Sequence, residues 1–355
     1  MARPSKIYID HQALTHNIQR VQQYAPNSQL VSVIKANAYG HGLVHIAKIL
    51  QADTDLFAVA AIEEAMVLRE AGIIKPILLL EGIFSADEAS LVEQYQLIPV
   101  IHHSEQLTML EKSALSQPIS AWLKINIGMC RLGIAPSELS KCVQRITLCP
   151  YIENQPVIMG HFPNADDLSD PLTKKQIQLF NQHVNGYKTK LSLANSAAII
   201  AWPNAHQDYV RPGIMLYGAS PIKNKTASDY DLKPVMTFSS KIMAIRHCQK
   251  GDAIGYGGDY ICKADKRIGV IAVGYGDGYP RHVPNGTPVL INKKIAPIVG
   301  RVSMDMITVD LTDHPTAEIG TEVILWGKGL PVEIIAEQAG TISYELLCQV
   351  TDRVR

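Results

Sequence analysis

The sequence predicts an α/β fold, in which a (β/α)8 TIM-type barrel is followed by a second, mainly β C-terminal domain. Eight short apolar runs alternate with longer amphipathic stretches between residues 30 and 217. Beyond about residue 230, closely spaced strands replace that alternation. The 355 residues accommodate both parts, because a barrel of this type takes up to about 250 residues.

The eight runs have the composition of parallel strands that helices cover on both sides. Each is short and rich in Val, Ile and Leu. They are LVSVIKA (30–36), LFAVAA (56–61), PILLLEG (76–82), LIPVIH (97–102), ISAWLKIN (119–126), VIMGHF (157–162), KLSLAN (190–195) and YVRPGIMLYG (209–218). Between them lie stretches with helical spacing, such as LVHIAKILQ and IEEAMVLREAG. Eight such units favour a closed barrel over an open sheet.

The second domain is predicted from strand-like runs with little helix between them. They are KPVMTFSSKIMAIRHC, IGVIAVGYG, TPVLINKKIAPIVG, MITVDL and EVILWG, followed by one helical stretch, VEIIAEQAG. We therefore assign residues 1–230 to the barrel and residues 231–355 to the mainly β domain.

The composition argues against several classes of protein. With 33 basic and 33 acidic residues, the chain has no net charge that would favour nucleic acid or an anionic membrane. Its first residues lack a secretory signal, and no apolar run approaches the roughly 20 residues of a membrane span. The six cysteines are scattered without metal-binding spacing. We therefore expect free thiols, no metal site and a cytoplasmic location.

Lys35 is the first candidate for chemistry, because it ends an apolar run and enters the glycine-containing turn KANAYGHG. Active-site side chains converge at that end of a barrel strand. Partial burial there favours the neutral, nucleophilic form of an amine. A lone lysine at such a place is more often an ordinary surface residue, so the assignment depends on its surroundings.

Those surroundings indicate an anion site across the barrel. A turn of small residues after the last run can present backbone amides to a phosphate, which barrel enzymes often bind near strands seven and eight. The candidates for this cradle are Tyr39, Asn195, Ser196, Arg211, Gly213 and Ile214. A reactive lysine facing a phosphate cradle is what pyridoxal 5'-phosphate requires.

The segment VIKANAYGHG resembles the cofactor-lysine signature of alanine racemases, which are fold type III pyridoxal-phosphate enzymes. Further segments similar to that family follow in its order through both domains: IEEAMVLREAG, LKINIGMCRLGI, GHFPNADD, LANSAA, VRPGIMLYG, IGYGGDY, VGYGDGYPR, GRVSMDM and TISYELL. The resemblance implies an isomerase that interconverts L- and D-alanine and supplies D-alanine for peptidoglycan. It also implies a homodimer with shared active sites.

The resemblance implies two catalytic bases on opposite faces of the substrate. Lys35 would carry the cofactor as a Schiff base and take the proton from D-alanine. Tyr256, from the partner subunit, would take the proton from L-alanine. A phenol has an ordinary pKa of about 10, so Tyr256 would need neighbouring donors or positive charge.

The other implied roles concern binding. The phosphate would be held by Tyr39, Ser196, Gly213, Ile214 and Tyr344, with Asn195 also in the cofactor site. Arg211 would face the pyridine nitrogen and His161 would pack near the ring. The substrate would meet Arg131 and the backbone of the partner's Met304. Supporting residues would be Lys124, Tyr275, Arg301 and Asp305. Some family members carry a carbamylated lysine at the place of Lys124; an unmodified lysine or a bound anion are the alternatives.

Each assignment has a simpler alternative. Arg131 could form a salt bridge at the barrel rim, and Tyr256 could be a packed tyrosine in a β-turn. His161 could be an interior histidine with satisfied hydrogen bonds. Met304 and Tyr344 could be core residues.

The sequence departs from the usual family pattern at two places, where it has Asn126 and Ile127 before GM, and Pro163 and Asn164 after HF. These residues lie near the proposed contacts to the substrate carboxylate and the cofactor ring, so the departures can change the substrate preference and the geometry of Arg131. A broad-specificity or serine racemase therefore stays open. A barrel-type decarboxylase is disfavoured because it would place an acid where Arg211 stands. A non-catalytic pyridoxal-phosphate-binding homeostasis protein would lack the second domain.

Overall fold

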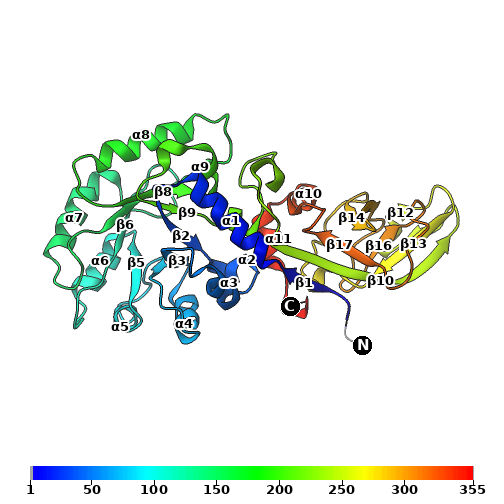
Figure 1. Cartoon of the computed structure of the whole chain (residues 1–355), viewed down its shortest axis with the longest axis horizontal. Helices are drawn as coiled ribbons and strands as arrows, with labels where there is room; N and C mark the ends of the chain where they lie inside the picture. Colours follow the sequence, from blue (N-terminus) through cyan, green and yellow to red (C-terminus); the bar gives the residue numbers. More distant parts are fainter. Residues whose placement is uncertain (1–2, 355) are drawn as a thin grey trace. The chain divides into compact units, whose positions relative to one another are not determined.

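The computed structural model describes residues 3–354, which form two compact units. One unit comprises residues 15–216 and 221–225. The other gathers the described residues up to 14, residues 217–220 and the described chain from 226 onward. This grouping by contacts differs from a division at 230/231, because the N-terminal segment and residues 217–220 group with the C-terminal part. Each unit is described by itself (Figure 1).

The first unit is a closed barrel of eight parallel strands, which confirms the predicted TIM-type fold. Each strand pairs with the next, and the pairs Gln29↔Tyr209 and Leu30↔Val210 close the ring. The strands are β2 (Gln29–Val33), β3 (Leu56–Val59), β4 (Ile77–Leu79), β5 (Leu97–Ile101), β6 (Trp122–Lys124), β7 (Val157–Met159), β8 (Leu191–Asn195) and β9 (Tyr209–Arg211).

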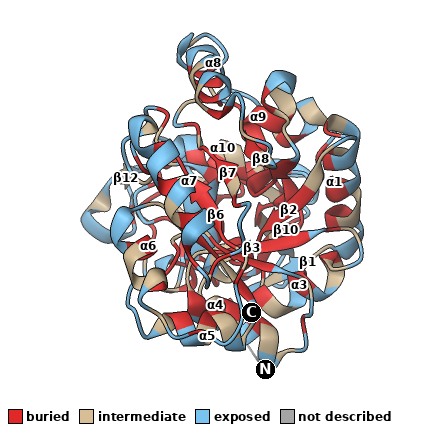
Figure 2. Ribbon diagram, turned by 90° about the vertical axis from the view of Figure 1, so that its left-hand side faces the viewer, coloured by how far each residue is buried: buried red, intermediate tan, exposed pale blue. Residues whose placement is uncertain are grey.

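Helices connect the strands and bury one face each. On α3 the buried residues are Leu43, Ile46, Ala47 and Leu50, at the three- and four-residue spacing of one helix face. All four residues of β3 are buried, as expected for strands covered on both sides. Figure 2 shows buried residues concentrated along the barrel strands. The helices of this part are α1 (His11–Tyr24), α2 (Lys35–Tyr39), α3 (Leu43–Leu50), α4 (Ile62–Glu70), α5 (Glu88–Gln94), α6 (Ser104–Glu111), α7 (Leu139–Leu148), α8 (Leu172–Val184) and α9 (Ser196–Ala201).

The second unit is built on an antiparallel sheet in the order β15-β14-β17-β10-β13-β16, with β1 also paired to β10. Its core includes Trp326, with Phe238 edge-on at 4.8 Å and Tyr279 stacked at 5.9 Å between ring centroids. The strands are β1 (Lys6–Ile9), β10 (Met236–Cys248), β11 (Ala253–Ile254), β12 (Tyr260–Ile261), β13 (Lys266–Ile271), β14 (Pro288–Ile291), β15 (Lys294–Pro297), β16 (Ile307–Asp310) and β17 (Glu322–Trp326). Two helices follow, α10 (Val332–Gln338) and α11 (Ser343–Gln349). The predicted mainly β character is confirmed.

The barrel strands are shorter than most of their apolar runs, and the first and last strands show why. The first strand ends at Val33, and the chain then enters the turn of α2. The last strand ends at Arg211, since Pro212 has no amide hydrogen to extend the ladder. Residues Ile214–Tyr217 form a 3-10 helix instead.

Among residues 3–354, no helix has the length and apolar character needed to cross a membrane. The six cysteines are free thiols, as predicted.

Candidate active site

The predicted barrel residues lie where strands end. Lys124, Asn195 and Arg211 are the last residues of β6, β8 and β9. Lys35 and His161 each follow their strand by two positions. Because the strands are parallel, their carboxyl ends open at one end of the barrel. The barrel therefore collects these side chains at one mouth, although up to 176 residues of sequence separate them.

Lys35 leads into a turn with an unusual backbone. The four residues from Ala36 to Tyr39 have φ between 52° and 53°, in the left-handed region that non-glycine residues seldom adopt. This turn brings the Tyr39 hydroxyl against Gly213, where an added Cβ would lie only 2.6 Å from it. Glycine at position 213 is therefore what allows the two loops to meet.

The predicted anion cradle lies beside this contact. The Gly213 amide donates to the Ser196 hydroxyl at 2.8 Å, and that hydroxyl can still donate its own proton. Asn195 accepts a hydrogen bond from the Ala198 amide at 3.0 Å and so caps α9. Ile214 is fully buried next to Gly213. Tyr39, Ser196 and Gly213 are thus brought together as predicted, whereas the Asn195 side-chain oxygen has a capping role.

Arg211 is buried, with 4% of its surface exposed. Its guanidinium donates to the Ser192 hydroxyl at 2.7 Å and to the Gly160 carbonyl at 2.8 Å. It also lies 3.2 Å from Nδ1 of His161. Burial lowers the pKa of Arg211 to about 10, so it stays charged at neutral pH. Burial and the Arg211 charge hold the pKa of His161 well below its usual value, which makes His161 neutral and able to accept from Arg211.

Lys124 is also buried, with 7% exposure. Burial lowers the pKa of its amine to about 8, and neighbouring positive charges act in the same direction. Those charges belong, in order of effect, to Arg211, Arg131 and Lys35, while Glu81 opposes them. The barrel mouth is therefore strongly cationic and suited to an anionic ligand.

The loop that carries Arg131 is shaped by one of the departures from the family pattern. The Asn126 side chain accepts hydrogen bonds from the Gly128 amide at 2.9 Å and the Cys130 amide at 3.0 Å. Ile127 is buried, and its carbonyl accepts from Gln176. Arg131 itself is exposed, and among residues 3–354 no carboxylate lies at ion-pair distance from it. The rim salt bridge is therefore wrong as an explanation of Arg131.

At the second departure, Asn164 hydrogen-bonds Asp170 through its side-chain amide. This bond closes the loop that follows His161, so the departure has a structural role of its own.

In the second unit, Tyr256 opens a short 3-10 turn between glycines with positive φ, and 72% of its surface is exposed. The packed-tyrosine alternative is therefore wrong. Tyr256 and Arg301 line one pocket of about 350 Å³, together with Ser303. Arg301 forms an ion pair with Asp259, so its charge is partly matched within this unit.

Met304 and Tyr275 lie on adjacent backbone segments. The Gly276 amide donates to the Met304 carbonyl at 2.9 Å, and the Tyr275 amide donates to the Ser303 carbonyl at 3.0 Å. Met304 is 53% exposed, which rules out its interpretation as a core residue. Asp305 is paired with Arg353 at 2.6 Å, and this hydrogen bond lowers the pKa of its carboxyl group. Tyr344, on α11, is also exposed, so its interpretation as a core residue is wrong.

Sequence reasoning missed three residues that hold the predicted ones in place. The Ser192 hydroxyl accepts a hydrogen bond from Arg211, and the Asp259 carboxylate forms an ion pair with Arg301. The Glu64 carboxylate accepts a hydrogen bond from the backbone amide of Ala36 at 2.6 Å. Only Asp259 could have been found from the sequence, since it stands in the glycine-rich segment with Tyr256. The other two act across long sequence separations that no local pattern marks.

Comparison with known proteins gives a consistent result. Residues 9–221 match the family model described as alanine racemase, N-terminal domain, and residues 235–355 match alanine racemase, C-terminal domain. An alanine racemase of Aeromonas hydrophila is 49% identical over 98% of this chain and 97% of that protein. One of Photobacterium profundum is 48% identical over 98% of this chain and 97% of that protein.

Solved structures agree over the full length. The biosynthetic alanine racemase of Pseudomonas aeruginosa superposes with a TM-score of 0.96 at 42% identity, covering 99% of this chain and 98% of that one. The alanine racemase of Acinetobacter baumannii has a TM-score of 0.94 at 42% identity, with the same coverage. With both of its units matched, the chain belongs to the alanine racemase family.

Proposed function

We propose that this chain is a cytoplasmic enzyme that interconverts L- and D-alanine with pyridoxal 5'-phosphate bound at Lys35, and so supplies D-alanine for peptidoglycan. One observation carries the proposal. A lysine two residues after β2 enters a left-handed turn that places the Tyr39 hydroxyl beside Gly213, at the mouth that also holds buried Arg211. Membership of the alanine racemase family supports the same activity.

The residues present fit this cofactor. Gly213 lacks the Cβ that would collide with the Tyr39 hydroxyl, and this brings two hydroxyls, those of Tyr39 and Ser196, to the Gly213 backbone. These groups, with Ile214, would hold the phosphate. Arg211 and His161 would meet the ring. When bound, pyridoxal phosphate supplies an electron sink that acidifies the Cα proton of the amino acid.

The chain's own residues would then move the proton. The Lys35 amine would exchange the Cα proton of D-alanine, and the Tyr256 hydroxyl would exchange the Cα proton of L-alanine. A proton can therefore leave on one face of the substrate and arrive on the other. Arg131 would bind the substrate carboxylate through a bidentate contact. In a homodimer with shared sites, Tyr256 and Met304 would reach the active site of the partner. Their exposure, with that of Met306 (42%), supports such an interface.

The direct test is an absorbance spectrum of the purified protein, borohydride trapping, and chiral analysis of L-alanine incubated with it. The expected result is a visible band from lysine-bound cofactor, a reduced adduct on Lys35, and D-alanine as product. A colourless protein that takes up no pyridoxal phosphate and leaves L-alanine unchanged would refute the proposal. Turnover of L-serine comparable to that of L-alanine would favour a broad-specificity racemase, and faster turnover of L-serine would favour a serine racemase.

Arg211→Glu is expected to raise the proportion of substrate that ends as pyruvate. A guanidinium gives up its proton with difficulty, so Arg211 leaves the ring nitrogen unprotonated and the electron sink weak, which favours return of the proton to Cα. Glutamate would allow that nitrogen to be protonated. The rate of racemisation should fall about tenfold to a hundredfold, because the hydrogen bonds that Arg211 donates to Gly160 and Ser192 are lost.

The measurement is the ratio of D-alanine to pyruvate formed from L-alanine. Arg211→Gln, whose amide cannot protonate the ring nitrogen, is the control and should retain the wild-type ratio. If Arg211→Glu also keeps that ratio, this role of Arg211 is wrong.

Lys124 is expected to carry a carbamate. Carbon dioxide adds only to the neutral amine, and a pKa of about 8 leaves a substantial neutral fraction near neutral pH. The modification converts a cation among cations into an anion that can pair with Arg131. Because the neutral fraction shrinks as pH falls below the pKa, occupancy should fall towards acid pH.

Native mass spectrometry with and without added bicarbonate measures this occupancy. The expected signal is one carbon dioxide per chain, absent from Lys124→Arg. An unmodified mass at pH 8 in bicarbonate would contradict the prediction.

A further inference from the structure

The turn that joins Lys35 to Tyr39 adopts a conformation its own sequence does not favour. Ala36, Asn37 and Ala38 all have φ of 53°, and Tyr39 has 52°. Left-handed backbone in several successive L-residues persists only where surrounding contacts enforce it. Contacts from outside the turn must therefore hold it in place.

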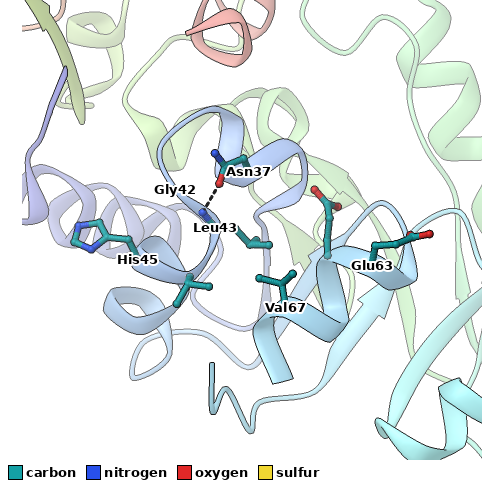
Figure 3. A pocket seen from close by; sticks show the side chains of 8 residues that line it. Asn37, Gly42, Leu43, His45, Glu63 and Val67 are labelled. Carbon is teal, nitrogen blue, oxygen red and sulfur yellow. Dashed lines mark hydrogen bonds between the residues drawn. The ribbon is translucent and has the colours of Figure 1, made fainter. Parts of the chain in front are cut away.

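Packing holds only the second half of the turn, where Ala38 and Tyr39 are buried. Ala36 is exposed, and a groove of about 530 Å³ lies beside the turn, between the starts of α3 and α4. Figure 3 shows Asn37 and Leu43 on one side of this groove and Glu63 and Val67 on the other. Polar contacts must therefore hold the exposed part of the turn in its left-handed conformation.

Three side chains provide those contacts. Nδ1 of the buried His41 lies 2.8 Å from the Tyr39 carbonyl oxygen and 3.1 Å from the Ala38 carbonyl oxygen, at the end of the turn. Asn37 accepts from the Leu43 amide at 2.7 Å and ties the end of the turn to α3 (Figure 3). At its beginning, the Ala36 amide donates to one carboxylate oxygen of Glu64 at 2.6 Å. The other oxygen of Glu64 accepts from the Ala60 amide at 2.9 Å. Glu64 thus bridges the loops that follow β2 and β3, with both bonds charge-assisted.

We propose that Glu64 is a positioning residue that holds the left-handed turn and thereby places the Lys35 amine and the Tyr39 hydroxyl together. The bond to Ala60, two residues before the start of Glu64's own helix, keeps the carboxylate in place. The bond to Ala36 acts directly after Lys35. Releasing that amide lets the turn relax, and Tyr39 then moves away from Gly213. The role in cofactor binding rests on the proposed function.

The test uses the full-length chain with Glu64→Gln and the matched control Glu63→Gln. Glu63 is the neighbouring carboxylate on α4 and is exposed. Glutamine has one acceptor oxygen, so its NH2 group must face one of the two amides and one bond is lost. Glu64→Asp keeps the charge but is too short to bridge both loops.

Three quantities are measured: the dissociation constant of pyridoxal phosphate, hydrogen exchange of residues 35–42 without cofactor, and the midpoint of thermal unfolding. We expect Glu64→Gln and Glu64→Asp to bind the cofactor about tenfold more weakly. Exchange should be faster only in residues 35–42 and at Ala60, because Glu64 holds the amides of Ala36 and Ala60. The midpoint of unfolding should match that of Glu63→Gln. The exchange measurement needs no cofactor, so it tests the bridge even if the proposed function fails.

Three results would overturn the inference, two of them seen in Glu64→Gln and one in Glu64→Asp. One is affinity and exchange in Glu64→Gln equal to those of Glu63→Gln, while the wild type still makes D-alanine. The second is exchange that rises evenly over the barrel with a lower unfolding midpoint, which would mean a general structural role. Wild-type affinity in Glu64→Asp would also overturn it, because charge alone would then suffice.

Discussion

Lys35→Ala is expected to lower racemisation by about 10⁴-fold or more and to remove the visible band of the lysine-bound cofactor. The variant loses both the amine that carries the cofactor and the base on the D face. The fold should persist, because Lys35 lies at a strand end outside the barrel core. The measurements are the absorbance spectrum and the rate of D-alanine formation from L-alanine.

Lys35→Arg is the control for charge. It keeps the cation at the mouth but cannot act as a nucleophile at neutral pH, so it should be as inactive as Lys35→Ala. Substantial activity in either variant, or borohydride labelling of another lysine such as Lys124, would show that the cofactor is carried elsewhere.

Tyr256→Phe is expected to lower racemisation about 10³-fold in both directions. Tyr256 is 72% exposed and lies on a glycine-rich turn, so the loss of one hydroxyl should leave the stability of the chain unchanged. The informative readout is exchange of the Cα hydrogen in deuterated water. D-alanine should still exchange, because Lys35 serves that face, whereas L-alanine should not.

Mixing the two variants tests whether sites are shared between chains. In a dimer with shared sites, a heterodimer of Lys35→Ala and Tyr256→Phe has one site with both bases intact. Random mixing makes half of the dimers mixed, so about a quarter of wild-type activity should return. If verified heterodimers stay inactive, each chain holds a self-contained site and the assignment of Tyr256 to the partner is wrong.

Much of the barrel was predictable because each of its strands is marked by a local pattern of apolar residues in the sequence. A short apolar run flanked by amphipathic stretches can bury both faces only within a parallel sheet covered by helices, and the eight runs all became barrel strands. The exception outside the barrel is instructive. The segment KIYI pairs with β10, more than 220 residues away, and its partly exposed pattern gives no sign of that pairing.

The candidate site also has residues that the sequence predicted and features that only the tertiary structure shows. Residue type and position at strand ends were enough to select Lys35, Ser196, Arg211 and Gly213, because parallel strands must deliver their ends to one mouth. The sequence alone therefore determined the barrel, the mainly β unit and most of the barrel residues now placed at its mouth. The tertiary structure alone decided the left-handed turn after Lys35, the bridge from Glu64 and the burial of Lys124 among cations. The physical reason is that local propensity opposes that turn, and contacts between residues distant in sequence outweigh it.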